Sequence, residues 1–318
     1  MRVVAVCVLL LLLVAGGTAR RSKKKAQKAT RDPNEAIAAA TAAQEAGDLE
    51  GAYRILDEAI ESSPKVFSPY FAKAQMTCKA DDYRTCKELY TKGIELAPAA
   101  HRGMFTQNIA LELGQAAYRA GQASGSKKPK KGAAAAKAAP GLRSPYKTAL
   151  TELETALSLS KETPTWVRAL YTKGQVHEAV AKVDQGGWAT SESAKLSIAA
   201  WEEVLQRLAA SQKLSEELKN VHPDCHTNLG VSFERLDRLA EAEGQFRAAL
   251  ALRPNHQVAL GHLRDVVDWQ HPDEPERWQQ VSQQGIDQGI WERIDQTPAM
   301  HYYTGLPTTP WPDVSSYP

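Results

Sequence analysis

Residues 223–256 read PDCHTNLGVSFERLDRLAEAEGQFRAALALRPNH, and this stretch decides the fold. Small and aromatic residues recur in it at helical spacing, and a proline closes it. The small positions are Gly230, Ala242 and Ala249, the aromatic positions are Phe233 and Phe246, and the proline is Pro254. Small residues let two helices approach closely, and aromatic residues fill the space between neighbouring pairs. The stretch therefore predicts two helices joined by a turn.

This order of small, aromatic and proline positions resembles the tetratricopeptide repeat, a helix–turn–helix unit of 34 residues. The same period recurs nearer the N-terminus. The pairs one period apart are Ala40 and Ala74, Ala52 and Cys86, Leu56 and Tyr90, Ala59 and Gly93, and Pro64 and Pro98. Because one hairpin cannot bury its own apolar face, such repeats stack into a continuous core. The resemblance implies an all-α solenoid, and chance spacing in an ordinary helical bundle is the alternative.

We expect about five repeats, within residues 33–121 and 144–270. The first two units are 33–66 and 67–100, and the last is 223–256. The third has a first helix that begins near 101 and a second helix displaced to 144–160. The fourth is degenerate and lies within 169–211. Residues 257–270 are predicted to form an extra helix that covers the end of the stack. Residues 271–318, which are rich in Trp, Pro and Tyr, form an irregular tail in this interpretation.

Two basic segments interrupt the pattern, RRSKKKAQKATR at 20–31 and SKKPKKGAAAAKAAP at 126–140. Both lack large apolar side chains and cannot pack, so we expect a disordered segment at 20–32 and a disordered loop at 122–143. The net charge of the whole chain is only +2. Without interleaved aromatic residues, the segments do not predict a nucleic acid partner. A contact with nucleic acid or anionic lipid is the alternative.

The N-terminus MRVVAVCVLLLLLVAGGTARR carries one early cation, an apolar run from Val3 to Val14 and small residues before Ala19. This pattern is typical of a secretory signal peptide over residues 1–19. The run is short for a membrane-spanning helix, which needs about 20 apolar residues. We therefore expect a protein of the endoplasmic reticulum lumen or a secreted protein. Attachment to a membrane by an uncleaved N-terminus is the alternative.

The cysteines outside the signal peptide, Cys78, Cys86 and Cys225, allow one disulfide if the compartment is oxidising. Cys78 is expected to end the first helix of the second repeat, and Cys86 to begin its second helix. The two would face each other across a tight turn, so a disulfide between them is reasonable. Cys86 also occupies a small-residue position of the repeat, where a buried free thiol would serve as well. Cys225 would be left single.

The motif His-Pro-Asp occurs twice, at 222–224 and 271–273. A His-x-Asp pair with a distant His is the facial triad of non-haem iron enzymes. That triad normally lies on a barrel strand, whereas both copies here fall between predicted helices. Proline at the first helical position with a nearby Asp is typical of a helix start. We therefore interpret both motifs as helix starts and assign no catalytic residue, no metal ligand and no cofactor.

The first helices of stacked repeats line one face of a solenoid, which is where a ligand is expected. The positions that fall on this face in the predicted register are Ile37, Thr41, Phe71, Gln75, Phe105 and Ile109. Tetratricopeptide domains that grip a chaperone's C-terminal carboxylate place Lys, Asn and Arg at these positions, and this sequence does not. A peptide or protein bound in a mixed apolar groove is the expected partner. In the alternative, Phe71 and Phe105 only pack between repeats.

The string from Gly289 to Asp313 resembles the segment that leads into the catalytic domain of aspartyl/asparaginyl β-hydroxylase-type dioxygenases. The matching residues are Gly289, Trp291, Gln296, Pro298, Tyr302, Gly305, Leu306, Pro310, Trp311 and Asp313. Members of that family carry tetratricopeptide-like repeats ahead of this segment and act in the secretory pathway. The sequence departs from the family at Thr297 and Pro312. The family's iron-binding histidines and 2-oxoglutarate-binding arginine would follow residue 313, so no catalytic residue is carried over.

Two functions follow from these expectations. The first is a non-catalytic protein-binding scaffold of the secretory pathway. The second is the N-terminal part of a hydroxylase-like dioxygenase whose catalytic domain is lacking, and iron and 2-oxoglutarate belong to this second hypothesis alone. We further expect the tail to fold back on the last helices, with Trp291 packing near Trp269 and Trp278.

Overall fold

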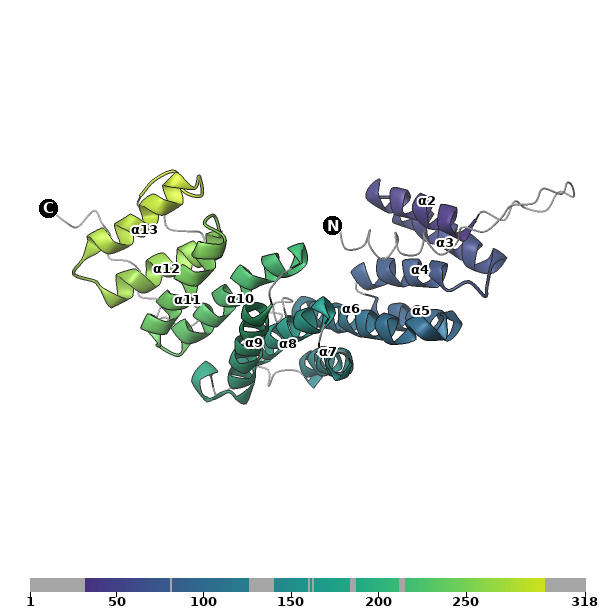
Figure 1. Cartoon of the computed structure of the whole chain (residues 1–318), viewed down its shortest axis with the longest axis horizontal. Helices are drawn as coiled ribbons and strands as arrows, with labels where there is room; N and C mark the ends of the chain where they lie inside the picture. Colours follow the sequence, from purple (N-terminus) through teal and green to yellow (C-terminus); the bar gives the residue numbers. More distant parts are fainter. Residues whose placement is uncertain are drawn as a thin grey trace, which may run out of the picture. The chain divides into compact units, whose positions relative to one another are not determined.

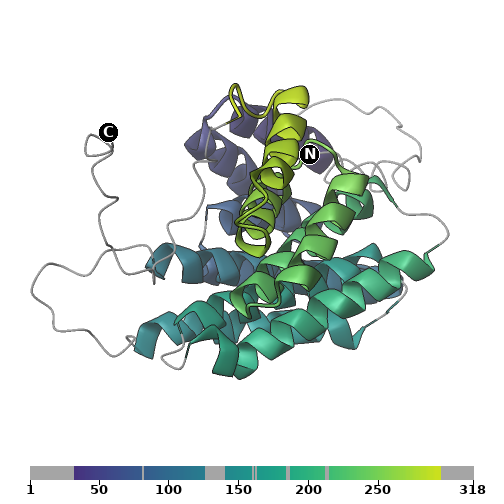
Figure 2. The same cartoon turned by 90° about the vertical axis from the view of Figure 1, so that its left-hand side faces the viewer.

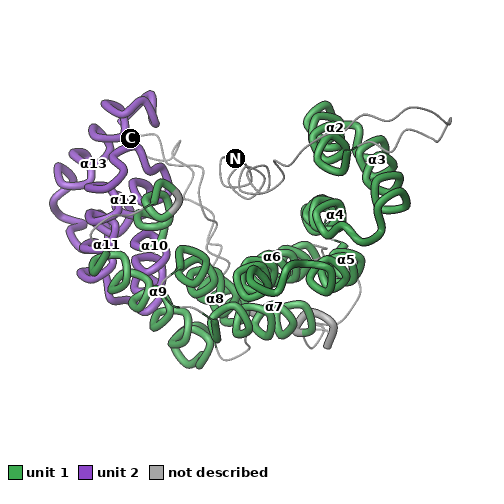
Figure 3. The backbone as a smooth tube through the Cα atoms, turned by 45° about the vertical axis from the view of Figure 1, so that its right-hand side comes forward, with its two compact units in different colours: residues 1–225 green, residues 226–318 purple. Residues whose placement is uncertain are grey.

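The structure is a computed structural model that describes residues 32–80, 82–125, 140–159, 161, 163–183, 187–211 and 215–294. Within these ranges the regular elements are α-helices and one short 3-10 helix, and no strand is formed (Figure 1, Figure 2). The chain divides into two compact units, residues 1–225 and 226–318 (Figure 3). The predicted signal peptide, the basic residues before Asp32 and the tail after Ile294 lie outside the described residues.

Unit 1 consists of successive helical hairpins. The elements are α2 (Pro33–Glu45), α3 (Leu49–Ser62), α4 (Ser68–Lys79), α5 (Tyr83–Leu96), α6 (Ala99–Gly125), α7 (Pro140–Ser158), α8 (Pro164–Val183), η1 (Trp188–Thr190) and α9 (Glu192–Ala210). Helix α10 (Glu216–Arg235) begins in unit 1 and ends in unit 2. The displaced second helix of the third repeat is therefore present as α7, which begins a few residues earlier than predicted.

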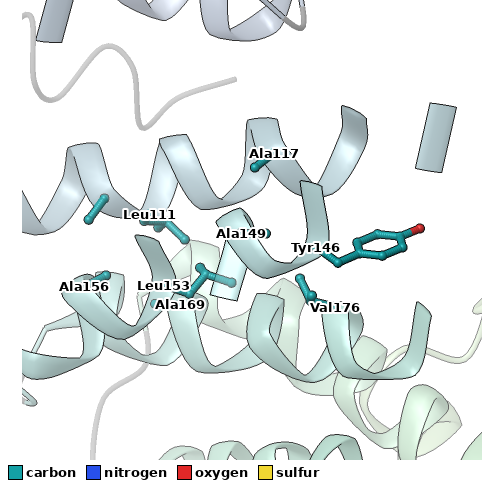
Figure 4. Packing of buried hydrophobic residues seen from close by; sticks show 9 residues of the cluster. Leu111, Ala117, Tyr146, Ala149, Leu153, Ala156, Ala169 and Val176 are labelled. Carbon is teal, nitrogen blue, oxygen red and sulfur yellow. The ribbon is translucent and has the colours of Figure 1, made fainter. Parts of the chain in front are cut away.

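The centre of unit 1 is a cluster of buried side chains from α6, α7 and α8 (Figure 4). Leu111 of α6 and Leu153 of α7 lie inside it, 2% and 0% exposed. Alanines at Ala149, Ala156 and Ala169 keep the three helices close together. Each fully buried leucine contributes about 1.5–3 kcal/mol through removal of apolar surface from water. This cluster joins the third hairpin to the first helix of the fourth.

Close packing in unit 1 depends on glycines that receive aromatic rings. A Cβ built on Gly174 would lie 2.5 Å from Nε1 of Trp201, and one built on Gly121 would lie 2.4 Å from Cε1 of Tyr146. Trp201 has no exposed surface. We call such a pair a glycine–ring contact, because any larger residue at the glycine would displace the ring.

Unit 2 continues the hairpin pattern with the C-terminal part of α10, followed by α11 (Leu239–Leu252), α12 (Gln257–Gln270) and α13 (Pro275–Asp287). One glycine–ring contact of this unit joins Gly230 of α10 and Phe246 of α11, where a Cβ would lie 2.6 Å from the ring. Phe246 is fully buried and stacks on His262, with 5.4 Å between ring centroids. The small and aromatic positions that decided the fold are therefore in contact.

The turns between helices have local causes. Asp48 accepts a hydrogen bond of 2.8 Å from the backbone N–H of Gly51, and Asp82 accepts one of 3.1 Å from Thr85. Each carboxylate satisfies a donor that the first helical turn leaves without a partner. Gly47 has a φ of +87° between α2 and α3, a conformation that favours glycine. These signals end one helix and begin the next within a few residues.

Two boundary predictions were wrong. Helix occupies both edges of the predicted loop at 122–143, since α6 extends to Gly125 and α7 begins at Pro140; residues 126–139 lie outside the described ranges. Pro223 does not begin a helix, because α10 begins at Glu216 and encloses it. The preceding turn buries Leu218, 7% exposed, and this packing outweighs the hydrogen bond that proline removes.

The second His-Pro-Asp motif precedes a helix but does not supply its first residue. His271 is the C-cap of α12, and α13 begins with Pro275. The helix α13 packs against α12, so the region predicted as an irregular tail from residue 271 starts with a regular helix. A turn through Gly289 at φ +67° then brings Trp291 back onto α13.

Candidate functional site

The six residues predicted to line a groove have different environments. Ile37 and Ile109 are 8% and 7% exposed and belong to two hydrophobic clusters, so they form core rather than a binding surface. Phe71 and Phe105 contact each other edge to face with 5.2 Å between centroids. Phe71 also fits against Gly93, where a Cβ would lie 2.3 Å from its ring. The two phenylalanines therefore pack between repeats.

The two polar members of that set behave differently. The hydroxyl of Thr41 donates to the carbonyl of Ile37 at 2.9 Å, one turn earlier in its own helix. The amide of Gln75 instead reaches from α4 to α6 and donates to Oε1 of Glu112 at 3.3 Å. Of the predicted groove, Gln75 is the residue that leads to a larger polar arrangement.

This arrangement joins α4, α6 and α8 by hydrogen bonds between side chains. Thr165 of α8 donates to Oδ1 of Asn108 at 2.6 Å, and Gln115 donates to Thr172 at 3.5 Å. We call the set the polar seam; it consists of Gln75, Asn108, Glu112, Gln115, Thr165 and Thr172. All are half-buried except Thr172, which is buried.

The seam keeps hydrogen-bonding capacity that the described part of the protein does not use. Gln75 and Gln115 each donate through Nε2, and their Oε1 atoms have no partner among the described residues. Asn108 accepts through Oδ1, and its Nδ2 is likewise unused within those residues. Since an amide group offers both donors and acceptors, this face can bond to a further polar chain.

Glu112 is the charged centre of the seam. Tyr90 donates its hydroxyl to Oε2 of Glu112, and Gln75 bonds to Oε1. Burial raises the pKa of the Glu112 carboxyl above its ordinary value, and the hydrogen bonds from Tyr90 and Gln75 oppose this rise, as do the charges of Arg168 and Lys79. Burial disfavours the charged form of this carboxyl, and the hydrogen bonds and the positive charges offset part of that cost.

Cations on two of the three helices act on this carboxyl, and a third cation lies on α6. Arg168 of α8 and Lys79 of α4 act on it electrostatically. Arg119 of α6 donates to the backbone carbonyl of Cys78 at 2.9 Å. The environment of the seam is therefore basic around one buried acid.

Sequence reasoning found Gln75 but missed the rest of the seam. The bonds Asn108–Thr165 and Gln115–Thr172 have the same sequence separation, 57 residues. This value differs from the 34-residue period because the third hairpin contains the basic insertion. A search for polar residues at equal spacing across that insertion could have found the pairs.

The structure joins Cys78 and Cys86 in a disulfide across the turn between α4 and α5, with 5.2 Å between Cα atoms. Both residues are buried, at 3% and 0% exposure. Cys225 is a buried free cysteine, and burial raises the pKa of its thiol well above the ordinary value. A high thiol pKa and burial make Cys225 unreactive.

The family-like motif of the tail is described only at its beginning. Trp291 is 6% exposed and lies against Gly285, while Trp269 is 45% exposed and Trp278 contacts the guanidinium of Arg264. The remaining motif positions lie beyond the described residues: Gln296, Pro298, Tyr302, Gly305, Leu306, Pro310, Trp311 and Asp313.

Two kinds of feature are absent from the described ranges. No group of three or more His, Cys, Asp or Glu residues is arranged there to hold a metal ion. None of the helices there has both the length and the apolar character required to cross a bilayer.

Comparison with solved structures identifies the fold class. The chain is similar to the pilus biogenesis factor PilW, with a TM-score of 0.50, 12% identity, and coverage of 83% of this chain and 97% of that one. It is similar to a chain of the APC/C hetero-tetramer Cut9–Hcn1, with a TM-score of 0.50, 13% identity, and coverage of 85% of this chain and 44% of that one. The C-terminal part of a TPR repeat-containing protein from Cytophaga hutchinsonii gives a TM-score of 0.50, 13% identity, and coverage of 79% and 78%.

These similarities confirm the prediction of an all-α tetratricopeptide-like fold. No protein-family profile matches the chain. No curated protein matches it either. The resemblance of the tail to β-hydroxylase-type dioxygenases therefore stays a prediction.

Proposed function

We propose that this protein is a non-catalytic scaffold that binds a polypeptide segment of a partner along the polar seam. The observation that carries the proposal is the unused hydrogen-bonding capacity of Gln75 on α4 and of Asn108 and Gln115 on α6. The fold supports it, because a helical-repeat framework holds these side chains on rigid elements.

The chemistry of the seam suits a peptide backbone. An extended peptide presents alternating N–H and C=O groups, and the seam offers amide acceptors at Gln75 and Gln115 and an amide donor at Asn108. Half-buried polar groups are poorly hydrated, so a hydrogen bond made there contributes more than one made in bulk water. The partner is therefore expected to bind in a stretched conformation, through its backbone.

We also propose that the protein acts in the lumen of the endoplasmic reticulum or outside the cell. The predicted signal peptide and the disulfide between Cys78 and Cys86 support this location, since stable disulfides form in oxidising compartments. A protease-protection assay tests it: the full-length chain, expressed in cells, should resist added protease in intact microsomes and be digested once detergent opens them.

The function is tested by selecting peptides that bind the purified chain from a random displayed library. Peptides that bind the seam should lose binding to a triple variant, Gln75→Ala, Asn108→Ala and Gln115→Ala. The matched control changes three exposed residues of α5 in the same unit, Glu88→Ala, Lys92→Ala and Glu95→Ala, and should leave binding intact. Selected peptides that bind the triple variant as well as the wild type would refute the seam as the site.

A further inference from the structure

Unit 2 contains a pocket that is distinct from the seam. It has a volume of about 260 Å³ and lies between α11, α12 and α13. Its polar lining includes Arg247 of α11 and Arg277, Gln280 and Gln284 of α13. A pocket of this size is smaller than a typical small-molecule site and can hold one side chain together with part of its adjoining backbone.

Hydrogen-bond donors exceed acceptors in the pocket. Arg247 uses Nε, at 2.8 Å, and one terminal nitrogen on Glu243. Arg277 uses Nε on Glu274 at 2.6 Å and contacts Nε2 of His271 through one terminal nitrogen at 3.4 Å. Each guanidinium has five N–H donors, so several are left without a partner in the described part of the chain. The side-chain amides of Gln280 and Gln284 also have no partner there.

Two acidic groups, Glu243 in the lining of the pocket and Glu274 near it, are already engaged. Glu243 accepts from Arg247 and from Gln270, the latter at 3.0 Å, and Glu274 is paired with Arg277 and His271. The C-terminal end of α12 also reaches the pocket, and its partial negative charge opposes an anion. Because of this opposition, a bound anion requires both arginines rather than one.

The floor of the pocket is apolar. Val267 of α12 and Val281 of α13 line it and are only 3% and 4% exposed. A ligand that reaches this floor needs methylene groups below a charged end. A glutamate side chain has this composition, with two methylenes and a carboxylate that fits the guanidinium fork.

We propose that this pocket binds the carboxylate side chain of an acidic residue, glutamate above all, in a partner polypeptide. The carboxylate is held by Arg247 and Arg277, and the methylenes rest on Val267 and Val281. The amides of Gln280 and Gln284 are placed to bond the adjoining backbone. This inference rests on the proposed function, and it adds a partner chemistry at a second place on the protein.

The test uses the full chain and three short peptides. The first is acetyl-Gly-Glu-Gly-amide, the second is acetyl-Gly-Gln-Gly-amide, and the third is acetyl-Gly-Gln-Gly with a free C-terminal carboxylate. Arginine Nε–H signals are followed by nuclear magnetic resonance and assigned with Arg247→Gln and Arg277→Gln. The glutamate peptide should shift both signals saturably, and each substitution should weaken its binding at least about tenfold, because each removes a charge-assisted hydrogen bond.

The matched control is Arg84→Gln in unit 1. Arg84 pairs with Glu88 one helical turn away at 3.1 Å, as Arg247 pairs with Glu243, but it does not line the pocket. The inference would be overturned if the glutamine peptide shifted the two arginine signals as much as the glutamate peptide does. It would also be overturned if Arg84→Gln weakened binding of the glutamate peptide as much as Arg247→Gln or Arg277→Gln does. Binding of the free-carboxylate peptide alone would assign the pocket to a chain terminus and overturn the side-chain assignment.

The two proposals fail separately. Seam-dependent peptide binding together with no response to the glutamate peptide would refute only the pocket. A response at Arg247 and Arg277 without any seam-dependent binding would refute only the seam.

Discussion

The indole of Trp291 lies against the backbone of Gly285, so close that a Cβ built on the glycine would be 2.1 Å from Cε3 of the ring. Gly285 belongs to α13, and Trp291 follows that helix after the turn at Gly289. The first aromatic residue of the family-like motif is thus part of unit 2. The expectation that the tail folds back is met at Trp291, which lies against Gly285 of α13.

The substitution Gly285→Ala should therefore destabilise unit 2. Displacing the ring is expected to cost about 1–3 kcal/mol, as overpacking does elsewhere. The better helix propensity of alanine offsets about 1 kcal/mol of this. Thermal unfolding and quenching of tryptophan fluorescence measure the loss of stability and the exposure of Trp291.

Gly244 in α11 provides the control, since a Cβ there would meet nothing within 4 Å. Gly244→Ala should stabilise the protein by about 0.5–1 kcal/mol, because only helix propensity changes. A melting temperature for Gly285→Ala as high as that of Gly244→Ala would contradict the contact described here.

Reduction of the disulfide should weaken unit 1. The bond closes a short loop, with a sequence separation of 8. Its removal is expected to cost about 2–3 kcal/mol in the chain-entropy account. The double variant Cys78→Ala and Cys86→Ala, compared with the wild type in urea with and without dithiothreitol, measures this. Reductant should lower only the stability of the wild type, and an equal effect on the double variant would exclude the disulfide as the cause.

The buried carboxyl of Glu112 should make stability depend on pH. Its pKa in the folded protein is raised, so the folded state binds more protons than the unfolded state at pH values just above the ordinary glutamate range. Stability should therefore fall as pH rises through that window. Urea unfolding of Glu112→Gln across the same pH range should show a flatter profile.

The control for Glu112 is Glu58→Gln, at an exposed position of α3. That variant should keep the wild-type profile. A profile unchanged in Glu112→Gln would show that this carboxyl does not titrate differently on folding.

His177 should lower the stability of the folded protein as pH falls, which is opposite to the pH dependence expected from Glu112. It is 7% exposed, its Nδ1 has no hydrogen-bond partner among the described residues, and burial together with the charge of Lys173 lowers its pKa to about 4. The unfolded state binds the proton first, so stability should fall as pH drops from the ordinary histidine value near 6.5 toward 4.

Replacing the buried imidazole tests this. His177→Leu should remove the acid-dependent loss and should not lower stability at neutral pH, since a buried polar atom without a partner is itself unfavourable. The exposed His101, changed to Gln, is the control and should retain the wild-type acid sensitivity. Loss of the acid dependence in both variants would point to a general electrostatic effect.

The helical repeats could be predicted because their signals are local. Gly230 and Phe246 occupy repeat positions that the sequence alone identifies, and they are in contact in the structure. Pro223 was misinterpreted for the opposite reason. Its local pattern is that of a helix start, whereas the burial of Leu218 extends α10 through it. Tertiary packing therefore outweighed the preference of proline for the first position of a helix.

The candidate site was less predictable. Ile37 and Ile109 fall on the expected face by spacing, yet the neighbouring helices cover them. The partners of the polar seam, such as Asn108 and Thr165, lie on either side of the basic insertion. Their proximity depends on how the long third hairpin packs, which the 34-residue period does not specify. The pocket of unit 2 likewise depends on α13, which was assigned to an irregular tail.

The glycine–ring contacts allow this protein to unfold locally, one hairpin at a time. Gly174 and Trp201 join only two successive helices, and so do Gly230 and Phe246. Opening one contact therefore exposes one hairpin and leaves distant ones intact. Amide hydrogen exchange should then report a graded series of opening energies along the chain. A partner that spans several hairpins would suppress these separate openings together and would make the protein unfold as a single cooperative body.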